Sequence, residues 1–347
     1  MKQNALPLIL LFSTLICIAS ECDPEREEEE PDPISEYDPA GRVSKDSVHI
    51  QWTTGEDIPY AQGWCAPLVI SDQMYVFGGF NKVEGINRII QCYDPGSDHW
   101  TVSETNMLKP RWGHSASVVD GKIYIMGGCL AAGGPGEKSI EVIDPVSGAT
   151  TQAGEMTVGR VGHSAAVYKG KIYIFSGELE EPSLTNIRDV DVYDPSDQSW
   201  ESLAPILTPR QFAASAVVKD TIYVIGGGSK YPYSGRKLIE AYYPETDSWK
   251  RKADLKIGIL EHGICVIDDK IYCVGGSYIW GDSGHGKVQI YDPELDSVYM
   301  ATDLQFARYG LACTAINGRI CVSTGINSPS PDFETLSSQT EIGIPDF

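Results

Sequence analysis

The sequence predicts an all-β protein in which six four-stranded sheets pack radially into a closed ring. A residue pair ending in glycine recurs six times, at spacings of 49, 49, 50, 49 and 49 residues, and its second members are Gly79, Gly128, Gly177, Gly227, Gly276 and Gly325. A second marker ends in proline and keeps the same phase, at Pro95, Pro145, Pro195, Pro244 and Pro293. A period near 50 indicates a repeat architecture. The 35 glycines and 21 prolines favour short strands and tight turns over long helices.

The second repeat shows how one copy is built. Residues 114–119 form the inner strand, Asp120-Gly121 makes a two-residue hairpin turn, and residues 122–126 form the next strand. A variable loop leads to a third strand at 139–143, and a short turn leads to a fourth. One such sheet cannot bury both of its faces. Six sheets in a closed ring bury them and leave no exposed edge.

These markers resemble the Kelch repeat, and the resemblance covers about residues 48–347. It implies a six-bladed β-propeller. The last copy supplies strands at 311–316, 319–323 and 340–344, so we expect residues 49–54 to add the missing outer strand and close the ring. Tyr37-Asp38-Pro39 looks like a further marker fragment, and leaves open that the N-terminal segment contributes two strands.

The N-terminus predicts export. Residues 1–20 contain Lys2 and an apolar run at 5–19 that has the length of a signal-peptide core. Residues 21–47 form an acidic linker before the propeller at 48–347. Cys22, directly after the run, resembles the acylated cysteine of bacterial lipoproteins, although Glu21 departs from that pattern. We therefore expect a secreted or extracytoplasmic protein, either free or lipid-anchored through Cys22.

Charge excludes one class of partner. The formal net charge is −21, and residues 1–33 hold two basic and eight acidic residues, which leaves −15 on the rest of the chain. A nucleic-acid partner needs basic patches, so we expect none.

An arginine recurs just before the inner strand in four copies, and the other two copies carry Gln62 and Ile259. The four are Arg111, Arg160, Arg210 and Arg308. In Kelch domains that bind acidic peptides, arginines at this position line the pocket, so the resemblance implies a ligand-binding ring for a carboxylate, sulfate or phosphate. The alternative is that each arginine packs against a neighbouring blade.

The loops after the glycine pairs carry aromatic residues. We expect these loops and the residues before the inner strands to lie at one mouth of the propeller's central channel. Tyr231, Tyr233 and Trp280 among polar neighbours suit a sugar or peptide ligand. His114, His163 and His262 share one repeat position, but they sit on different blades around a wide channel, so we expect inner-strand packing and no metal. No cofactor is expected.

Cysteines give no disulfide framework. The Asp268-Asp269 turn places Cys265 opposite Tyr272, and the same register places Cys321 opposite Thr314. Neither hairpin therefore closes a simple disulfide.

The leading hypothesis is a monomeric binding module that recognises a glycan, peptide or other acidic ligand at the channel mouth. The alternative is a sugar mutarotase. Glu178 directly follows Ser176-Gly177, and Arg188 lies ten residues on. This resembles the secreted bacterial sialate mutarotases of the Kelch type, in which a glutamate would move the anomeric proton.

Overall fold

In a computed structural model of the protein, the described residues are 47–132, 134–179, 185–229, 234–279, 283–327 and 335–346. They belong to one compact unit, Ala40–Phe347. The predicted signal segment, Cys22 and the Tyr37-Asp38-Pro39 fragment lie outside the described residues, as do Tyr231, Tyr233 and Trp280.

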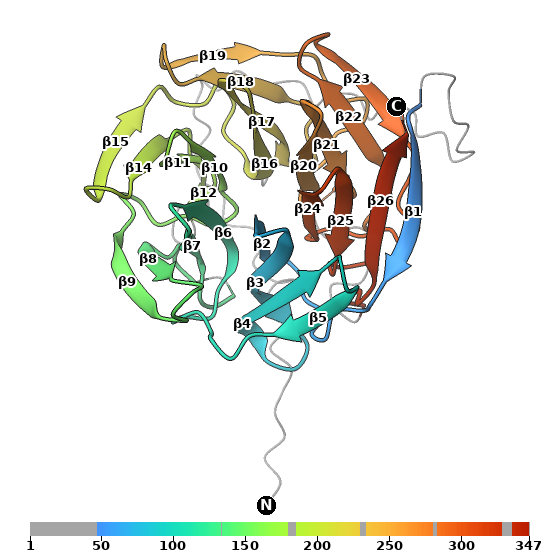
Figure 1. Ribbon diagram of the computed structural model, residues 1–347. Coiled ribbons are helices and arrows are strands. Elements are labelled where there is room, and N and C mark those ends of the chain that lie inside the picture. The colour runs from blue at the N-terminus through green and yellow to red at the C-terminus, as the bar shows by residue number, and fades with distance from the viewer. Residues whose placement is uncertain are drawn as a thin grey trace, which may run out of the picture. The chain divides into compact units, whose positions relative to one another are not determined.

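Six four-stranded antiparallel sheets surround a central axis, as the repeat predicts (Figure 1). In each blade the first strand of the repeat is innermost. Blade 1 contains β2 (Ala66–Ile70), β3 (Gln73–Asn81), β4 (Gly85–Asp94) and β5 (His99–Val102). Blade 2 contains β6 (Trp112–Val119), β7 (Lys122–Cys129), β8 (Ser139–Ile143) and β9 (Thr150–Glu155). Blade 3 contains β10 (Ser164–Tyr168), β11 (Lys171–Phe175), β14 (Val190–Asp194) and β15 (Ser199–Leu203).

The remaining blades follow the same order. Blade 4 contains β16 (Gln211–Val218), β17 (Thr221–Gly228), β18 (Ile239–Tyr243) and β19 (Ser248–Arg251). Blade 5 contains β20 (Gly263–Ile267), β21 (Lys270–Val274), β22 (Val288–Asp292) and β23 (Ser297–Ala301). Blade 6 contains β24 (Ala312–Ile316), β25 (Arg319–Ser323), β26 (Thr340–Asp346) and β1 (His49–Gly55). A separate two-stranded sheet joins β12 (Glu178–Leu179) to β13 (Thr185–Asn186), in the connection between β11 and β14 of blade 3.

The N-terminal strand closes the ring, which confirms the predicted closure. Strand β1 pairs antiparallel with β26, with Trp52 opposite Gly343. Ile50 and Trp52 are buried in a core cluster formed with blades 5 and 6. The Trp52 Nε1 donates to the Thr302 carbonyl at 3.1 Å, so the strand is fixed by apolar burial and by hydrogen bonds to the neighbouring blade.

The marker residues are structural. The tyrosine of the proline marker packs on the tryptophan that follows it, with ring centroids 4.9 Å apart for Tyr193–Trp200 and for Tyr242–Trp249. The Tyr242 hydroxyl donates to Asp247 Oδ1 at 2.7 Å. These pairs fill the space between blades and satisfy the buried hydroxyl groups.

The hairpin registers also agree with the sequence. Cys265 lies opposite Tyr272, and Cys321 lies opposite Thr314. The seven cysteines in the described part of the chain are free thiols. Within the same residues, no helix is long and apolar enough to span a membrane.

Candidate functional site

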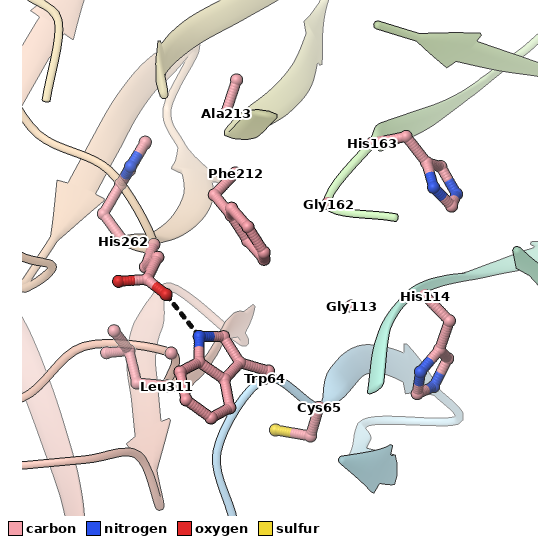
Figure 2. A pocket seen from close by; sticks show the side chains of 12 residues that line it. Trp64, Cys65, Gly113, His114, Gly162, His163, Phe212, Ala213, His262 and Leu311 are labelled. Atoms are coloured by element: carbon pink, nitrogen blue, oxygen red, sulfur yellow. Dashed lines mark hydrogen bonds between the residues drawn. The ribbon is translucent and has the colours of Figure 1, made fainter. Parts of the chain in front are cut away.

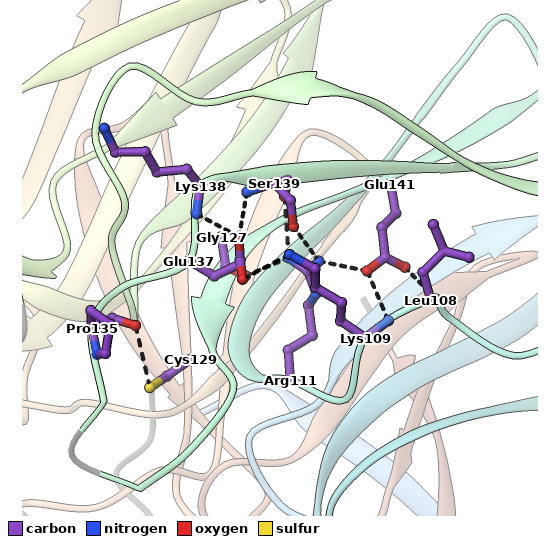
Figure 3. Close-up of polar contacts among 10 residues, drawn as sticks. All are labelled: Leu108, Lys109, Arg111, Gly127, Cys129, Pro135, Glu137, Lys138, Ser139 and Glu141. Carbon is purple, nitrogen blue, oxygen red and sulfur yellow. Dashed lines mark hydrogen bonds and ion pairs between the residues drawn. The ribbon is translucent and has the colours of Figure 1, made fainter.

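The four repeat-position arginines are held inside the blades. Arg111, Arg160, Arg210 and Arg308 are at most 1% exposed. Figure 3 shows the arrangement in blade 2, where Arg111 Nη2 lies 2.6 Å from Glu141 Oε1 and Arg111 Nη1 donates to the Gly127 carbonyl at 2.7 Å.

Each of the other three arginines also pairs with a carboxylate from the third strand of its own blade. The distances are 2.6 Å for Arg160–Asp191, 2.8 Å for Arg210–Glu240 and 2.5 Å for Arg308–Glu341. Burial lowers the pKa of Arg210 to about 10, although Glu240 opposes this shift. None of the four arginines lines the channel cavity described below. Their guanidinium groups hold strands together, and the ligand-binding role stays a prediction that this geometry does not support.

The two blades without arginine change both partners. Blade 1 has Gln62 at the arginine position and Gln91 at the acidic position, and blade 5 has Ile259 and Gln289. The Gln91 amide accepts from the Tyr60 N–H and donates to the Tyr60 carbonyl, both at 2.9 Å. In both blades that lack the arginine, the carboxylate that would pair with it is replaced by a neutral glutamine. This covariation within one chain is what a buried structural ion pair requires.

Six residues, one from each blade, form a closed ring of backbone hydrogen bonds around the axis, which we call the collar. Each donates its N–H to the carbonyl of the equivalent residue in the preceding blade, at 2.7–3.1 Å. All six have φ between 51° and 63°. They are Trp64, Gly113, Gly162, Phe212, Glu261 and Gly310.

Three collar positions are therefore non-glycine residues in the left-handed region, which L-residues adopt at a cost of about 1–3 kcal/mol each. Two of the collar glycines give room to the neighbouring aromatic side chains. A Cβ added at Gly162 would meet the Phe212 ring at 3.0 Å, and one added at Gly310 would meet Trp64 Cδ1 at 3.3 Å. Glycine at these two positions therefore accommodates the large side chains of Trp64 and Phe212.

A cavity of about 110 Å³ lies at the collar, on the rim where the inner strands begin. It is lined by the six collar residues and by the residue that follows each of them. The Phe212 ring and the Trp64 indole both lie inside the ring of lining residues, and the indole is hydrogen-bonded to Glu261 (Figure 2). Trp112 adds to this aromatic cluster, with its ring centroid 5.5 Å from that of Trp64 and 6.3 Å from that of Phe212.

Glu261 is the acidic group of this cavity. Its carboxylate accepts hydrogen bonds from Trp64 Nε1 and, at 3.2 Å, from Ser277 Oγ. The side chain is buried, and this burial raises its pKa from 4.5 to about 7, while the two hydrogen bonds act in the opposite direction. A carboxyl group that titrates near neutrality beside aromatic rings is typical of a functional site.

The histidines that follow the collar are lining residues of the cavity, but their rings do not converge on its middle. The rings of His114 and His163 point away from its middle (Figure 2). A Cβ added at Gly127 would lie 2.5 Å from His163 Cε1, and one at Gly226 would lie 2.8 Å from His262 Cε1, so these rings pack on the glycine pair of the preceding blade. Burial lowers the pKa of His163 and of His262 to about 3. Among the described residues, no cluster of His, Cys, Asp or Glu has the arrangement of a metal site.

Glu178 lies beside the collar and not in it. Its backbone bridges Val161, with the Glu178 N–H 2.9 Å from the Val161 carbonyl, and its side chain is 6% exposed. It does not line the cavity. Arg188 is exposed, and its Nε donates to the Ile206 carbonyl at 2.9 Å.

The collar residues are not among the site residues predicted from the sequence, although the repeat carries a signal for them. They stand two positions after the arginine position of each repeat and read Trp, Gly, Gly, Phe, Glu, Gly along the chain. A single acidic residue among glycines and aromatic residues at one repeat position marks a deviation from the structural pattern.

Family models identify the repeat. The model described as the KLHDC2/KLHL20/DRC7 Kelch-repeats domain matches residues 142–325, and the Kelch motif model matches 65–106 and 110–156. This chain is a Kelch-repeat protein. The six-bladed propeller that the sequence predicts is therefore the Kelch fold.

Relatives and structures agree on the repeat. Alpha-scruin of Limulus polyphemus is 26% identical over 53% of this chain and 21% of its own length. Kelch-like protein 25 of Xenopus tropicalis is 25% identical over 50% of this chain and 30% of its own length. The Kelch chain therefore matches less than a third of each of these relatives. The solved structure of YjhT superposes with a TM-score of 0.68 at 15% identity and covers 83% of this chain and 96% of its own, a likeness of fold.

Proposed function

We propose that this Kelch propeller is a protein-interaction module that takes its partner at the channel mouth, with the collar as the binding centre. The supporting observation is the collar itself. Three strained, non-glycine residues with two aromatic rings and a carboxyl group meet at one rim. The polar residues at positive φ in the hairpin turns, such as Asp120 and Asn317, are of types that tolerate this conformation. Bulky residues such as Trp64 and Phe212 seldom adopt it, and strained residues of this kind cluster at binding and catalytic sites.

The size of the cavity supports a side chain over a whole small molecule. Pockets that enclose a drug-sized ligand measure about 300–1,000 Å³, whereas the collar cavity measures about 110 Å³. A partner protein that lies across the rim and inserts the end of one side chain fits this volume. A bound sugar ring would lie mostly above the collar, stacked on Trp64 and Trp112.

Charge argues against the acidic ligand that the sequence suggested. The arginines that would attract it are buried in ion pairs, and the cavity is lined by Glu261. We retain the predicted export and the monomeric state as proposals, since both concern where and how the module acts and neither changes the binding surface.

Site-specific photo-cross-linking tests the proposal. Val83 is 79% exposed on the turn between β3 and β4, at the mouth rim, and Val146 is 96% exposed on the turn between β8 and β9, at the opposite rim. With benzoylphenylalanine at either position, an extract of the source cells should give a discrete protein adduct at position 83 and none at position 146. Adducts at position 146 alone, or no adduct at position 83, would contradict the proposal.

The mutarotase alternative makes a different prediction on the same protein. If the propeller only binds, sialic acid anomers should interconvert at the spontaneous rate, as followed by NMR. Interconversion well above that rate, lost in Glu178→Gln and retained in Glu84→Gln, would replace the binding module with an enzyme. General acid–base catalysis contributes about 10²–10⁴-fold, so the difference is readily measured.

A further inference from the structure

We propose that the group inserted into the collar is an alkylammonium, the end of a partner lysine side chain, held by the Glu261 carboxylate and the faces of Trp64 and Phe212. This inference rests on the proposed interaction function and names the chemistry that the collar recognises.

The charge balance of the cavity favours a cation. Besides Glu261, the titratable side chains that line it are Cys65, His114, His163 and His262. Burial raises the pKa of the Cys65 thiol to about 12 and lowers those of the three imidazoles far below neutrality. None of these four groups carries charge between pH 6 and pH 8. Ionised Glu261 therefore makes the cavity negative, on a protein whose chain beyond residue 33 has a net charge of −15.

The aromatic rings suit the same ligand. A cation is attracted to the face of a tryptophan or phenylalanine ring when it lies within about 6 Å of the centroid. Trp64 and Phe212 come from opposite parts of the collar, and both rings lie inside the ring of residues that line the cavity (Figure 2). A lysine stem would contact the rings while its ammonium group meets the carboxylate, so apolar and charged parts both find partners.

The volume selects the end of a chain. A cavity of about 110 Å³ holds a short alkylammonium and leaves no room for an entire amino acid. The rest of the partner then lies on the rim, where the turn that carries Val83 is exposed.

The first experiment uses n-butylammonium as the probe and n-butanol as its neutral counterpart. Binding to the full chain is followed by NMR through the Trp64 indole N–H, which a Trp64→Phe variant assigns. Butylammonium should shift this resonance at millimolar concentrations, and butanol should not. Equal shifts with both probes, or with neither, would overturn the proposal.

The pH dependence needs no variant. A carboxyl with a pKa of about 7 is about one-tenth ionised at pH 6 and nine-tenths ionised at pH 8. Butylammonium should therefore bind about tenfold more tightly at pH 8. An affinity that is the same at both values would contradict a contact with Glu261.

Variants then locate the contact. Glu261→Gln should abolish the preference for butylammonium over butanol, and Phe212→Leu should weaken binding while leaving the pH dependence in place. Glu84→Gln removes the same charge from an exposed position on the same rim and should bind like the wild type. Loss of the preference in Glu84→Gln, or its retention in Glu261→Gln, would assign the cation to a different place.

The partner itself separates this inference from the proposed function. Acetylation of the partner's lysines should abolish the adduct at position 83. An adduct that survives acetylation and Glu261→Gln would overturn the ammonium proposal and leave the interaction module standing. Butylammonium binding without any partner adduct would do the reverse.

Discussion

The Trp64 indole N–H donates a hydrogen bond to the Glu261 carboxylate, and the same indole packs against Gly310. This contact joins blade 1 to blade 5 over the collar residue of blade 6, the blade that the N-terminal strand completes. It also gives the buried carboxyl group a fixed direction beside the aromatic rings. The same bond therefore serves the closure of the ring and the placement of the group that we propose contacts a ligand.

Glu261 should make stability depend on pH. Its pKa is near 4.5 in the unfolded chain and about 7 in the fold, so the native state binds the proton more tightly. Its stabilising contribution is complete below pH 4.5 and is lost as the pH rises through 7. Between pH 5 and pH 8 the free energy of unfolding should fall by about 2–3 kcal/mol more in the wild type than in Glu261→Gln. Urea unfolding of both proteins at the two pH values measures this, and parallel pH profiles would show that Glu261 does not titrate in this range.

The buried ion pairs should behave like the natural exchange seen in blade 5. Arg210→Ile leaves Glu240 charged and unpaired, and should cost about 3–5 kcal/mol of unfolding free energy. The double variant Arg210→Ile/Glu240→Gln reproduces the Ile259 and Gln289 of blade 5 and should recover most of that loss. Chemical denaturation of the three proteins measures the recovery. A double variant no more stable than Arg210→Ile would show that the charge of Glu240 is not what the arginine balances.

The role of the collar glycine Gly162 can be tested by comparison with Gly121, a turn glycine that also has a positive φ. Gly162 and Gly121 have φ of 63° and 73°, but only Gly162 faces another side chain, the Phe212 ring, because nothing lies within 4 Å of a Cβ at Gly121. Gly121→Ala should cost about 1–2 kcal/mol, the cost of the left-handed backbone alone. Gly162→Ala should cost at least 1 kcal/mol more, because the Phe212 ring stacks on Trp112 and has little room to move. Thermal unfolding compares them, and equal losses would mean that the ring yields freely.

The ring closure predicts unequal truncations. Deletion of residues 1–56 removes β1 with the buried Ile50 and Trp52 and exposes the edge of β26. A large drop in melting temperature or loss of solubility should follow. Deletion of residues 1–33 should be tolerated. Equal melting temperatures for the two truncated proteins would contradict the closure by β1.

The fold was predictable because it depends on the spacing of the sequence repeat and on the need to pair every strand edge. Spacings near 49 residues define the blades, and a last copy one strand short requires a partner for β26, which residues 49–54 supply. The site was harder to predict, since a repeat position does not say which way a side chain points. The repeat position of Arg111 predicts a side chain at the channel mouth. In the structure this side chain instead pairs with Glu141 on the third strand of its own blade.

The role of Glu261 is hard to predict from the sequence for a related reason. Its importance depends on the left-handed backbone of the collar, which joins three glycines, two aromatic residues and Glu261 into one hydrogen-bonded ring. The local sequence of residues 259–262 does not predict a left-handed backbone at Glu261. Only the comparison of all six copies shows that a glutamate occupies a position otherwise held by glycine or an aromatic residue.

The most direct measurement is the chemical shift of the Trp64 indole N–H as the pH is raised from 5 to 9. Because this proton is donated to Glu261, its resonance should titrate with a midpoint near 7 in the wild type, and the titration should disappear in Glu261→Gln. Butylammonium should lower the midpoint, since it favours the ionised carboxylate. A resonance that stays constant over this range, or a midpoint that butylammonium leaves unmoved, would contradict Glu261 as the ligand-binding group of the collar.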